Sequence, residues 1–349
     1  RDLLDLCEQT LSADWLPQVK FTVFGGQGFI GRHLVKHLRS IEHEVFAPSR
    51  VELRDLSADL GHVVYAIGLT GDFRSRFKET IEAHVDTLIE TMANARFESW
   101  LYLSSTRLYG IENSRKPSDE SSAITLHPSA DKLYDVSKLM GETWCLAQPQ
   151  ETIRVARLSN VYGDGQSDAT FLGDVLRSLN QTGSAEIGDA PSSTKDYVSI
   201  NDVVDLLTKI SIEGKARVYN VASGQNVSHQ QLAHRLTELS GHPVSFIAGG
   251  HKRCLQPIDV RRIQEEFSVQ SSSILDDMIL SIEKGYLLEN FSSGMEDPKN
   301  WGIQCVAVKG REIINGKLSG KIVSPVFLTG FVPDLLKSIS MVSPDLILS

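Results

Sequence analysis

The chain has 349 residues, a formal net charge of -9 at pH 7 and a hydrophobic content of 41%. This length is enough for one elaborated domain or for two domains with a sizeable core, while the acidic balance argues against nucleic acid or an anionic membrane as a partner. The four cysteines are scattered without a CxxC spacing, which argues against a disulfide framework or a metal site and fits a reducing cytoplasm.

Short apolar segments alternate with amphipathic ones through the first half of the chain. An amphipathic helix is predicted over 2–16, ahead of the first strand. The segments that follow predict strands at 20–24, 44–47, 62–67, 100–104 and 153–158 and helices at 29–40, 79–94 and 134–147. Such alternation is typical of an α/β fold in which helices cover both faces of a parallel sheet. No apolar run is long enough to cross a bilayer, so we expect no membrane partner.

Beyond residue 165 the pattern is looser. It predicts helices near 168–180, 201–211, 228–239, 259–267 and 273–286 and strands near 196–199, 217–221 and 244–248. The stretch 290–300 is rich in Ser, Gly, Asn, Asp and Pro, which indicates a linker. Alternating apolar and polar residues over 303–325, around Asn315 and Gly316, predict a hairpin.

A glycine-rich turn joins the first predicted strand to the first predicted helix. Gly25, Gly28 and Gly31 lie three residues apart. Gly25 permits the tight turn, Gly28 lets a pyrophosphate approach the backbone, and Gly31 lets the helix pack close to the strand. The free N–H groups and the dipole of the helix N-terminus favour an anion. The turn therefore predicts a dinucleotide site, although a glycine-rich turn in another α/β protein would look alike.

A tyrosine and a lysine share one face of the helix predicted at 134–147. Tyr134 and Lys138 are four residues apart, so their side chains are neighbours on that face. An ammonium group near a phenol lowers a pKa that is ordinarily about 10, and such a tyrosine can exchange a proton near neutral pH. The alternative is an ordinary solvated helix face.

Small hydroxyl residues gather where the strand at 100–104 ends. Ser104, Ser105 and Thr106 follow its apolar residues. The carboxyl ends of strands in α/β sheets border the crevice in which ligands bind, so these hydroxyls are candidates for substrate contacts. An ordinary serine-rich turn is the alternative, and the three signals carry weight because they occur together and in this order.

From about residue 19 to 290 the chain resembles the extended short-chain dehydrogenase/reductases, in particular the group of NAD-dependent epimerases and dehydratases that modify nucleotide sugars. The matching features are the glycine turn, Ser105 four residues before Tyr109 and Gly110, the pair of Tyr134 and Lys138, and the segments 157–163, 195–202 and 218–224. The resemblance implies a Rossmann-type doubly wound sheet: a dinucleotide-binding domain over 1–165 with return segments near 196–222, and substrate-binding segments over 166–290. It leaves 295–349 as a C-terminal extension of unknown role.

The resemblance also implies roles for individual residues. Ser105 would hydrogen-bond the substrate oxygen at the reacting carbon, and Tyr134 would be the acid/base. Lys138 would hold the nicotinamide ribose and tune Tyr134. Asn160 would contact the diphosphate of the substrate, and Lys195 stands where relatives often carry an arginine with that task.

Cofactor choice depends on the end of the second strand. Relatives that prefer NAD usually carry an acidic residue there, whereas this chain has Ser49 and Arg50. A hydroxyl followed by a guanidinium suits a 2′-phosphate, so we predict NADP(H) in preference to NAD(H). The remaining cofactor contacts that the resemblance implies are Phe29, Ile30, Asp55, Leu56, Ala66, Ile67 and Gly68.

The predicted reaction is a hydride transfer to or from a sugar carbon of a nucleotide-linked sugar, either as a keto-sugar reductase or as an epimerase. Family dehydratases carry an Asp-Glu pair just after the active-site hydroxyl, where this chain has Thr106 and Arg107; Thr106 remains a candidate substrate contact, and dehydration is disfavoured. The alternative is a non-catalytic NAD(P)-binding regulatory or scaffold protein. Relatives commonly pair the Tyr134 helix and the 79–94 helix between subunits, so a homodimer is expected.

Overall fold

The structure is a computed structural model. It describes residues 18–49, 52, 59–69, 71, 73–93, 95–111, 116–277, 284–297, 302–314, 317–324 and 326–331. The amphipathic helix predicted over 2–16 lies outside these residues.

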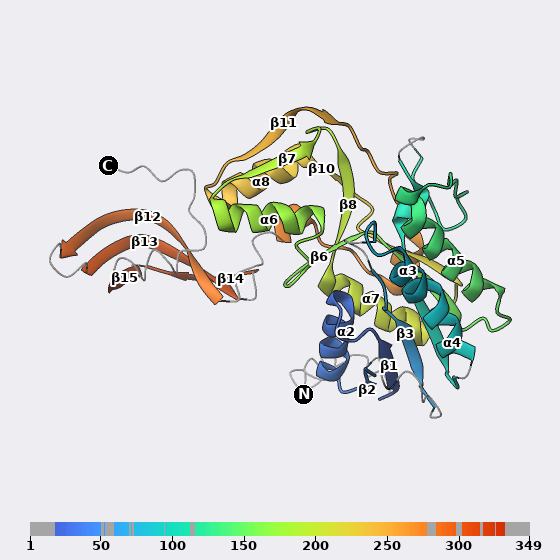
Figure 1. Cartoon of the computed structure of the whole chain (residues 1–349). Coiled ribbons are helices and arrows are strands. Elements are labelled where there is room, and N and C mark those ends of the chain that lie inside the picture. Colours follow the sequence, from blue (N-terminus) through green and yellow to red (C-terminus); the bar gives the residue numbers. More distant parts are fainter. Residues whose placement is uncertain are drawn as a thin grey trace, which may run out of the picture.

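A six-stranded parallel sheet lies between two groups of helices, at the lower right of Figure 1. Its strand order is β2-β1-β3-β4-β5-β9, with bounds β1 (Lys20–Phe24), β2 (Glu44–Phe46), β3 (His62–Tyr65), β4 (Ser99–Ser105), β5 (Ile153–Leu158) and β9 (Val218–Val221). The order reverses beside β1, because the chain adds β2 on one side of it and β3 on the other. Such a reversal opens a crevice at the carboxyl ends of β1 and β3. The predicted doubly wound fold is confirmed.

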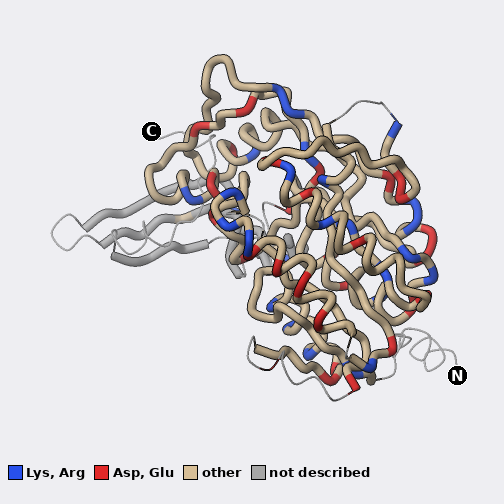
Figure 2. The backbone as a smooth tube through the Cα atoms, turned by 45° about the vertical axis from the view of Figure 1, so that its right-hand side comes forward, with Lys and Arg blue, Asp and Glu red and all other residues tan. Residues whose placement is uncertain are grey.

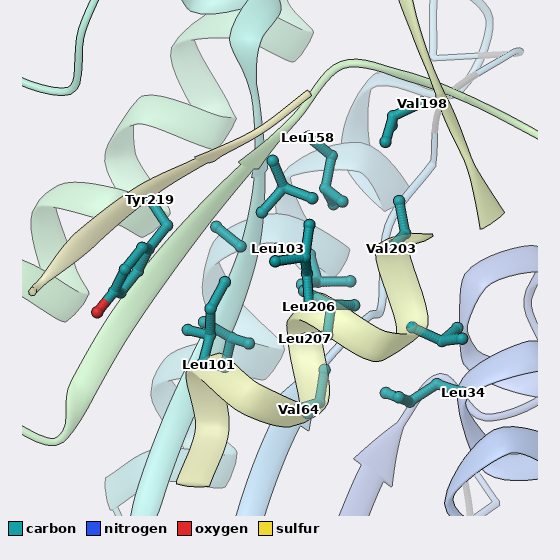
Figure 3. Close-up of a cluster of buried hydrophobic side chains, with 14 of the residues drawn as sticks. Leu34, Val64, Leu101, Leu103, Leu158, Val198, Val203, Leu206, Leu207 and Tyr219 are labelled. Atoms are coloured by element: carbon teal, nitrogen blue, oxygen red, sulfur yellow. The ribbon is translucent and has the colours of Figure 1, made fainter. Parts of the chain in front are cut away.

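Successive strand residues send their side chains to opposite faces of this sheet. On one face Val64, Leu101 and Leu103 pack with α2 (Phe29–Ser40) and α7 (Ile200–Glu213), as Figure 3 shows. On the other face the neighbouring strand residues pack with α4 (Thr87–Ala93) and α5 (Leu133–Ala147). Both faces are therefore covered, which is why the strands read as continuous apolar runs.

The helix predicted over 79–94 is divided in the structure. It consists of α3 (Phe77–Ile81), a π-helical turn η2 (Glu82–Asp86) and α4. A π turn holds one residue more than an α turn and is found often at functional sites. Here it carries His84, which lies against Tyr134.

The second half of the chain adds a smaller mixed α/β layer. Its strands are β6 (Asn160–Tyr162), β7 (Ala185–Asp189), β8 (Thr194–Ser199), β10 (Asn226–Ser228) and β11 (Val244–His251), in the orders β10-β8-β6 and β11-β7. The helices are α6 (Phe171–Thr182), α8 (His229–Ser240), α9 (Arg261–Phe267) and α10 (Ile274–Asp277). Apolar residues of α6 and α8 pack on β7, forming a separate core.

Four antiparallel strands follow, and two predictions fail there. They are β12 (Lys284–Asp297), β13 (Gly302–Ile314), β14 (Lys317–Val323) and β15 (Val326–Phe331), which lie apart from the parallel sheet in Figure 1. The helix predicted over 273–286 is described over Ile274–Asp277, but residues 284–286 belong to β12, and so do residues 290–297 of the predicted linker. Pairing with β13 overrides the loop-like composition, with an irregularity of register between Phe291 and Ser293.

The predicted hairpin is confirmed, because β13 and β14 pair in antiparallel fashion with Ile314 opposite Lys317.

Acidic and basic residues are interspersed over the body rather than separated by sign (Figure 2). Among the described residues no helix combines the length and the apolarity that a membrane crossing needs.

Candidate functional site

The glycine turn lies where the strand order reverses. Gly25 follows β1 with φ +81°, and a Cβ added there would come within 2.9 Å of the Ala66 carbonyl after β3. A Cβ on Gly31 would lie 2.1 Å from the Gly25 oxygen, and the N–H of Gly28 donates to that same oxygen at 2.9 Å. Gly25 and Gly31 must therefore be glycine for the turn to close. Because these glycines have no side chains, the turn leaves space for a diphosphate above the N-terminus of α2.

Other predicted cofactor contacts surround this turn. Phe29 and Ile30 are half-buried in the first turn of α2, and Ala66 packs on the same core. Ile67 packs on the core of the other face, and Gly68 is exposed. These residues line the strand ends on both sides of the crevice.

The segment after β2 holds an acidic residue, Glu52, that sequence reasoning missed. The Glu52 carboxylate accepts a hydrogen bond from the Ser49 N–H at 2.7 Å, and hydrogen bonding by Ser49 lowers the pKa of that carboxyl. The predicted contacts Arg50, Asp55 and Leu56 lie outside the described residues.

Tyr134 is buried at the first turn of α5, with 6% of its surface exposed. Its ring packs at 5.5 Å on Phe73 and edge-on at 5.2 Å to His84, and the Ser105 hydroxyl lies close enough to its phenol to affect its ionisation. Burial raises the pKa of Tyr134 to about 12, against opposing effects of the Arg107 charge and the Ser105 hydrogen bond. The structure thus brings the predicted hydroxyl and the predicted acid/base together.

Lys138 lies one helical turn further along α5 and is also buried. Its ammonium donates to the Leu103 carbonyl at 2.8 Å and lies 5.0 Å from the centre of the Tyr102 ring. Burial lowers the pKa of Lys138 to about 7, although the Glu142 carboxylate acts in the opposite direction. A Cβ on Gly68 would lie 3.4 Å from the Lys138 Nζ, so the ammonium borders the predicted cofactor crevice.

His84 is a second residue that sequence reasoning missed. Its Nδ1 lies 2.8 Å from the Ser137 Oγ, which donates to the Tyr134 carbonyl. The Leu69 N–H donates to Nε2 at 3.4 Å, so His84 presents an acceptor at Nε2 and a proton at Nδ1. Burial and the nearby Lys138 charge lower the pKa of His84 to about 2. The neutral ring therefore ties the start of α5 to the loop after β3.

The residues after Ser105 do not point a carboxylate at the site. Thr106 donates to the Leu158 carbonyl at 3.4 Å. The Arg107 Nε lies 2.8 Å from the fully buried Asp135 carboxylate, which also accepts from Lys132 at 2.9 Å. The Asp135 carboxylate is therefore neutralised by two cations, Arg107 and Lys132.

The predicted substrate contacts lie on the adjoining strands β6 and β8, which pair with Asn160 opposite Tyr197. Asn160 is exposed, and its amide group donates to the Asp196 carbonyl at 2.7 Å. The Lys195 Nζ lies 4.0 Å from the centre of the Phe171 ring. Burial lowers the pKa of Lys195 to about 8, against the opposing charge of Asp189.

Comparison with known proteins identifies the class. The model of the NAD dependent epimerase/dehydratase family matches residues 21–222. The chain therefore belongs to the NAD dependent epimerase/dehydratase family, as its resemblance implied.

Individual relatives are distant. A dTDP-4-dehydro-6-deoxy-D-allose reductase of Streptomyces sp is 25% identical over 265 residues, which cover 63% of this chain and 81% of the reductase. A dTDP-glucose 4,6-dehydratase of Streptomyces griseus is 26% identical over 202 residues, covering 55% of this chain and 60% of the dehydratase. The solved structure of MoeE5 in complex with UDP-glucose and NAD shares the fold with a TM-score of 0.62 at 23% identity, covering 74% of this chain and 95% of that one.

Proposed function

We propose that this protein is an NADP(H)-dependent oxidoreductase that acts on a sugar carbon of a nucleotide-linked sugar, as a keto-sugar reductase or an epimerase. The observation that carries the proposal is the meeting of Ser105, Tyr134 and Lys138 beside the glycine turn. The family membership and the Streptomyces reductase relative support the substrate class.

In this proposal each side chain has a task. When bound, the nicotinamide would be the donor or the acceptor of the hydride that the sugar carbon exchanges. Tyr134 gives a proton to the sugar oxygen or takes one from it through its phenol oxygen, and Ser105 hydrogen-bonds the same oxygen. Lys138 borders Gly68 on the cofactor side, where it would hold the ribose. Burial of Tyr134 and Lys138 excludes water from the proton transfer.

Dehydration is disfavoured because water elimination needs acid/base groups that these positions do not supply. Thr106 and Arg107 take the places of the two acids that family dehydratases carry. Thr106 has its hydroxyl bonded to a backbone carbonyl, and Arg107 is paired with Asp135. The carboxylate nearest to Tyr134 in sequence is therefore already neutralised.

The variant Tyr134→Phe tests the proposal. We expect it to abolish turnover of a nucleotide-linked 4-keto sugar while NADPH still binds, because the ring is kept and only the proton carrier is lost. Persistence of turnover would refute the role of Tyr134. A native chain that binds NADPH but turns over no member of a panel of nucleotide-linked keto sugars would favour the regulatory or scaffold alternative. In a single turnover, lasting loss of nicotinamide absorbance indicates a reductase, and its recovery indicates an epimerase.

Cofactor preference is tested at the end of β2. We expect Arg50→Ala to raise the KM for NADPH and to leave the KM for NADH unchanged, since a guanidinium there would pair with the 2′-phosphate. Glu52→Ala is the matched variant, because its carboxylate is fixed to the Ser49 N–H and would repel the same phosphate. It should lower the KM for NADPH. A native enzyme with a firm preference for NADH would reverse the assignment.

A homodimer through α3 and α5 also belongs to the proposal. The two helices pack together, and large apolar side chains on both are exposed, namely Phe77, Ile81, Val136 and Met140. Exposed apolar patches of this kind mark interaction sites. Light scattering should give the mass of two chains, and Met140→Glu should give one. A native chain that scatters as a monomer would contradict the dimer.

A further inference from the structure

The side chains that surround the ring of Tyr134 differ in how accessible they are. Phe73 and His84, which both pack on this ring, are buried. The guanidinium of Arg107 lies 5.4 Å from the ring centre, and 37% of this side chain is exposed. A ligand that approaches the Tyr134 phenol can therefore contact the Arg107 guanidinium, whereas Phe73 and His84 are shielded from it.

Several contacts fix the guanidinium in place. Its Nε lies 2.8 Å from the fully buried Asp135 carboxylate, and the guanidinium lies 5.3 Å from the centre of the Phe73 ring. The backbone N–H of Arg107 donates to the Ser105 hydroxyl at 3.2 Å. The turn η3 (Thr106–Tyr109), which follows β4, thus carries a cation at a fixed position beside the predicted substrate hydroxyl. A cation that is held in this way loses little freedom when an anion binds to it.

These contacts leave the outer end of the guanidinium available. A guanidinium has five N–H donors. The ion pair with Asp135 engages Nε, and within the described part of the chain neither Nη atom of Arg107 donates a hydrogen bond. Asp135 also has a second cation, because Lys132 donates to its other oxygen at 2.9 Å. Neutralising the buried carboxylate therefore does not account for the exposed Nη groups.

We propose that Arg107 is a specificity-determining residue that binds a carboxylate on the sugar, so that the preferred substrate is a nucleotide-linked sugar acid. The inference rests on the proposed function, in which the reacting carbon carries the oxygen that is hydrogen-bonded to the Tyr134 phenol. A carboxylate on a nearby carbon of the same sugar would face Arg107, and its two oxygens match the paired N–H groups of a guanidinium. A neutral hydroxymethyl group at that carbon offers no charge to this cation.

The test compares ligands that differ only in this group. UDP-glucuronate carries a carboxylate where UDP-glucose carries a hydroxymethyl group, and dTDP-glucuronate with dTDP-glucose and GDP-mannuronate with GDP-mannose are two further such pairs. Calorimetric titration of the full chain measures the affinities with NADPH present, because none of these ligands has a ketone that the reduced cofactor could convert. We expect the native chain to bind a sugar acid about tenfold or more tightly than its neutral partner, since a hydrogen bond to a charged group contributes at least that factor.

Variants locate the origin of this preference. Arg107→Leu should abolish it, and Arg107→Lys should keep part of it, because the charge remains and the paired donors are lost. Arg74→Leu is the matched control and should keep the preference. Arg74 also lies over the Phe73 ring, at 4.6 Å, but its Nε donates to the exposed Asp131 at 2.7 Å.

Each outcome decides the question. Equal affinities of the native chain for acid and neutral sugar, or a preference that survives Arg107→Leu, overturn the proposal. An equal loss in Arg74→Leu also overturns it, because general attraction of charge would then suffice. If Arg107→Leu does not fold, Arg107→Gln takes its place with the same expected loss. A native chain that binds none of these nucleotide sugars overturns the proposed function, whereas binding without preference overturns only the assignment of Arg107.

Discussion

The ion pair between Glu142 and Arg157 should be the strongest polar contact that holds α5 on the sheet. Both side chains are buried, with 1% and 6% exposed. The Arg157 Nη2 lies 2.7 Å from one Glu142 oxygen, and its Nε contacts both oxygens at 3.0 and 3.2 Å. At an effective dielectric constant near 20, one such contact corresponds to about 6 kcal/mol of gross attraction. Breaking a buried pair by removing one partner costs about 3–5 kcal/mol.

The variant Glu142→Gln leaves Arg157 buried with a neutral partner and the Tyr109 hydroxyl, which accepts from it at 2.8 Å. We therefore expect a loss of about 3–5 kcal/mol in the free energy of unfolding and a fall in Tm of at least about 6 °C. Thermal and urea unfolding monitored by circular dichroism measure both. The double variant Glu142→Leu/Arg157→Leu should recover much of the loss, because no charge is left buried.

A matched control is the half-exposed pair of Asp205 and Lys209 on α7, with Nζ and Oδ2 2.9 Å apart. Asp205→Asn should change stability by less than about 1 kcal/mol, since exposed pairs contribute little. If the Tm of Glu142→Gln lies within about 2 °C of the native Tm, the loss of stability is below about 1 kcal/mol and the buried pair does not anchor α5.

Two further predictions concern the crevice. Gly31→Ala should weaken NADPH binding at least about tenfold in a fluorescence titration, because its Cβ would lie 2.1 Å from the Gly25 oxygen and the turn must open. The control Gly188→Ala, whose Cβ would meet only Ile247 at 3.9 Å, should bind NADPH normally. Equal affinities of the two variants for NADPH would refute the argument. For Lys138, burial holds the folded pKa at about 7 while the unfolded chain keeps that proton, so stability should rise by about 1.5 kcal/mol from pH 7 to 8.5. Urea unfolding of Lys138→Met should lack this rise, and an unchanged pH dependence would contradict it.

Sequence reasoning located the features that one short segment specifies. The glycine turn, the strand before it and the helix after it lie within 20–40, so local spacing determined all three. The expectation for Tyr134 and Lys138 was correct in placing both on one helix. The sequence did not reveal the partner of the Lys138 ammonium, the Leu103 carbonyl, which is 35 residues away in sequence. Contacts of this separation leave no periodic signal.

The misread segments fail for related reasons. The π turn at Glu82–Asp86 interrupts a helix whose amphipathic pattern continues on both sides, so periodicity cannot reveal it. Residues 290–297 have the composition of a loop, and only the facing strand β13 makes them a strand. Tertiary pairing overrides local propensity in such cases.

Buried polar contacts, rather than apolar packing alone, set the register of α5 on the sheet. Along this helix Asp135 pairs with Arg107 after β4, Lys138 donates to the β4 backbone, and Glu142 pairs with Arg157 on β5. Apolar contacts tolerate small shifts and repacking, but a buried charge that loses its partner does not. A slide of α5 would break all three contacts at once. The place of Tyr134 above the crevice is thus a consequence of three charges distributed over two turns of the helix that carries it.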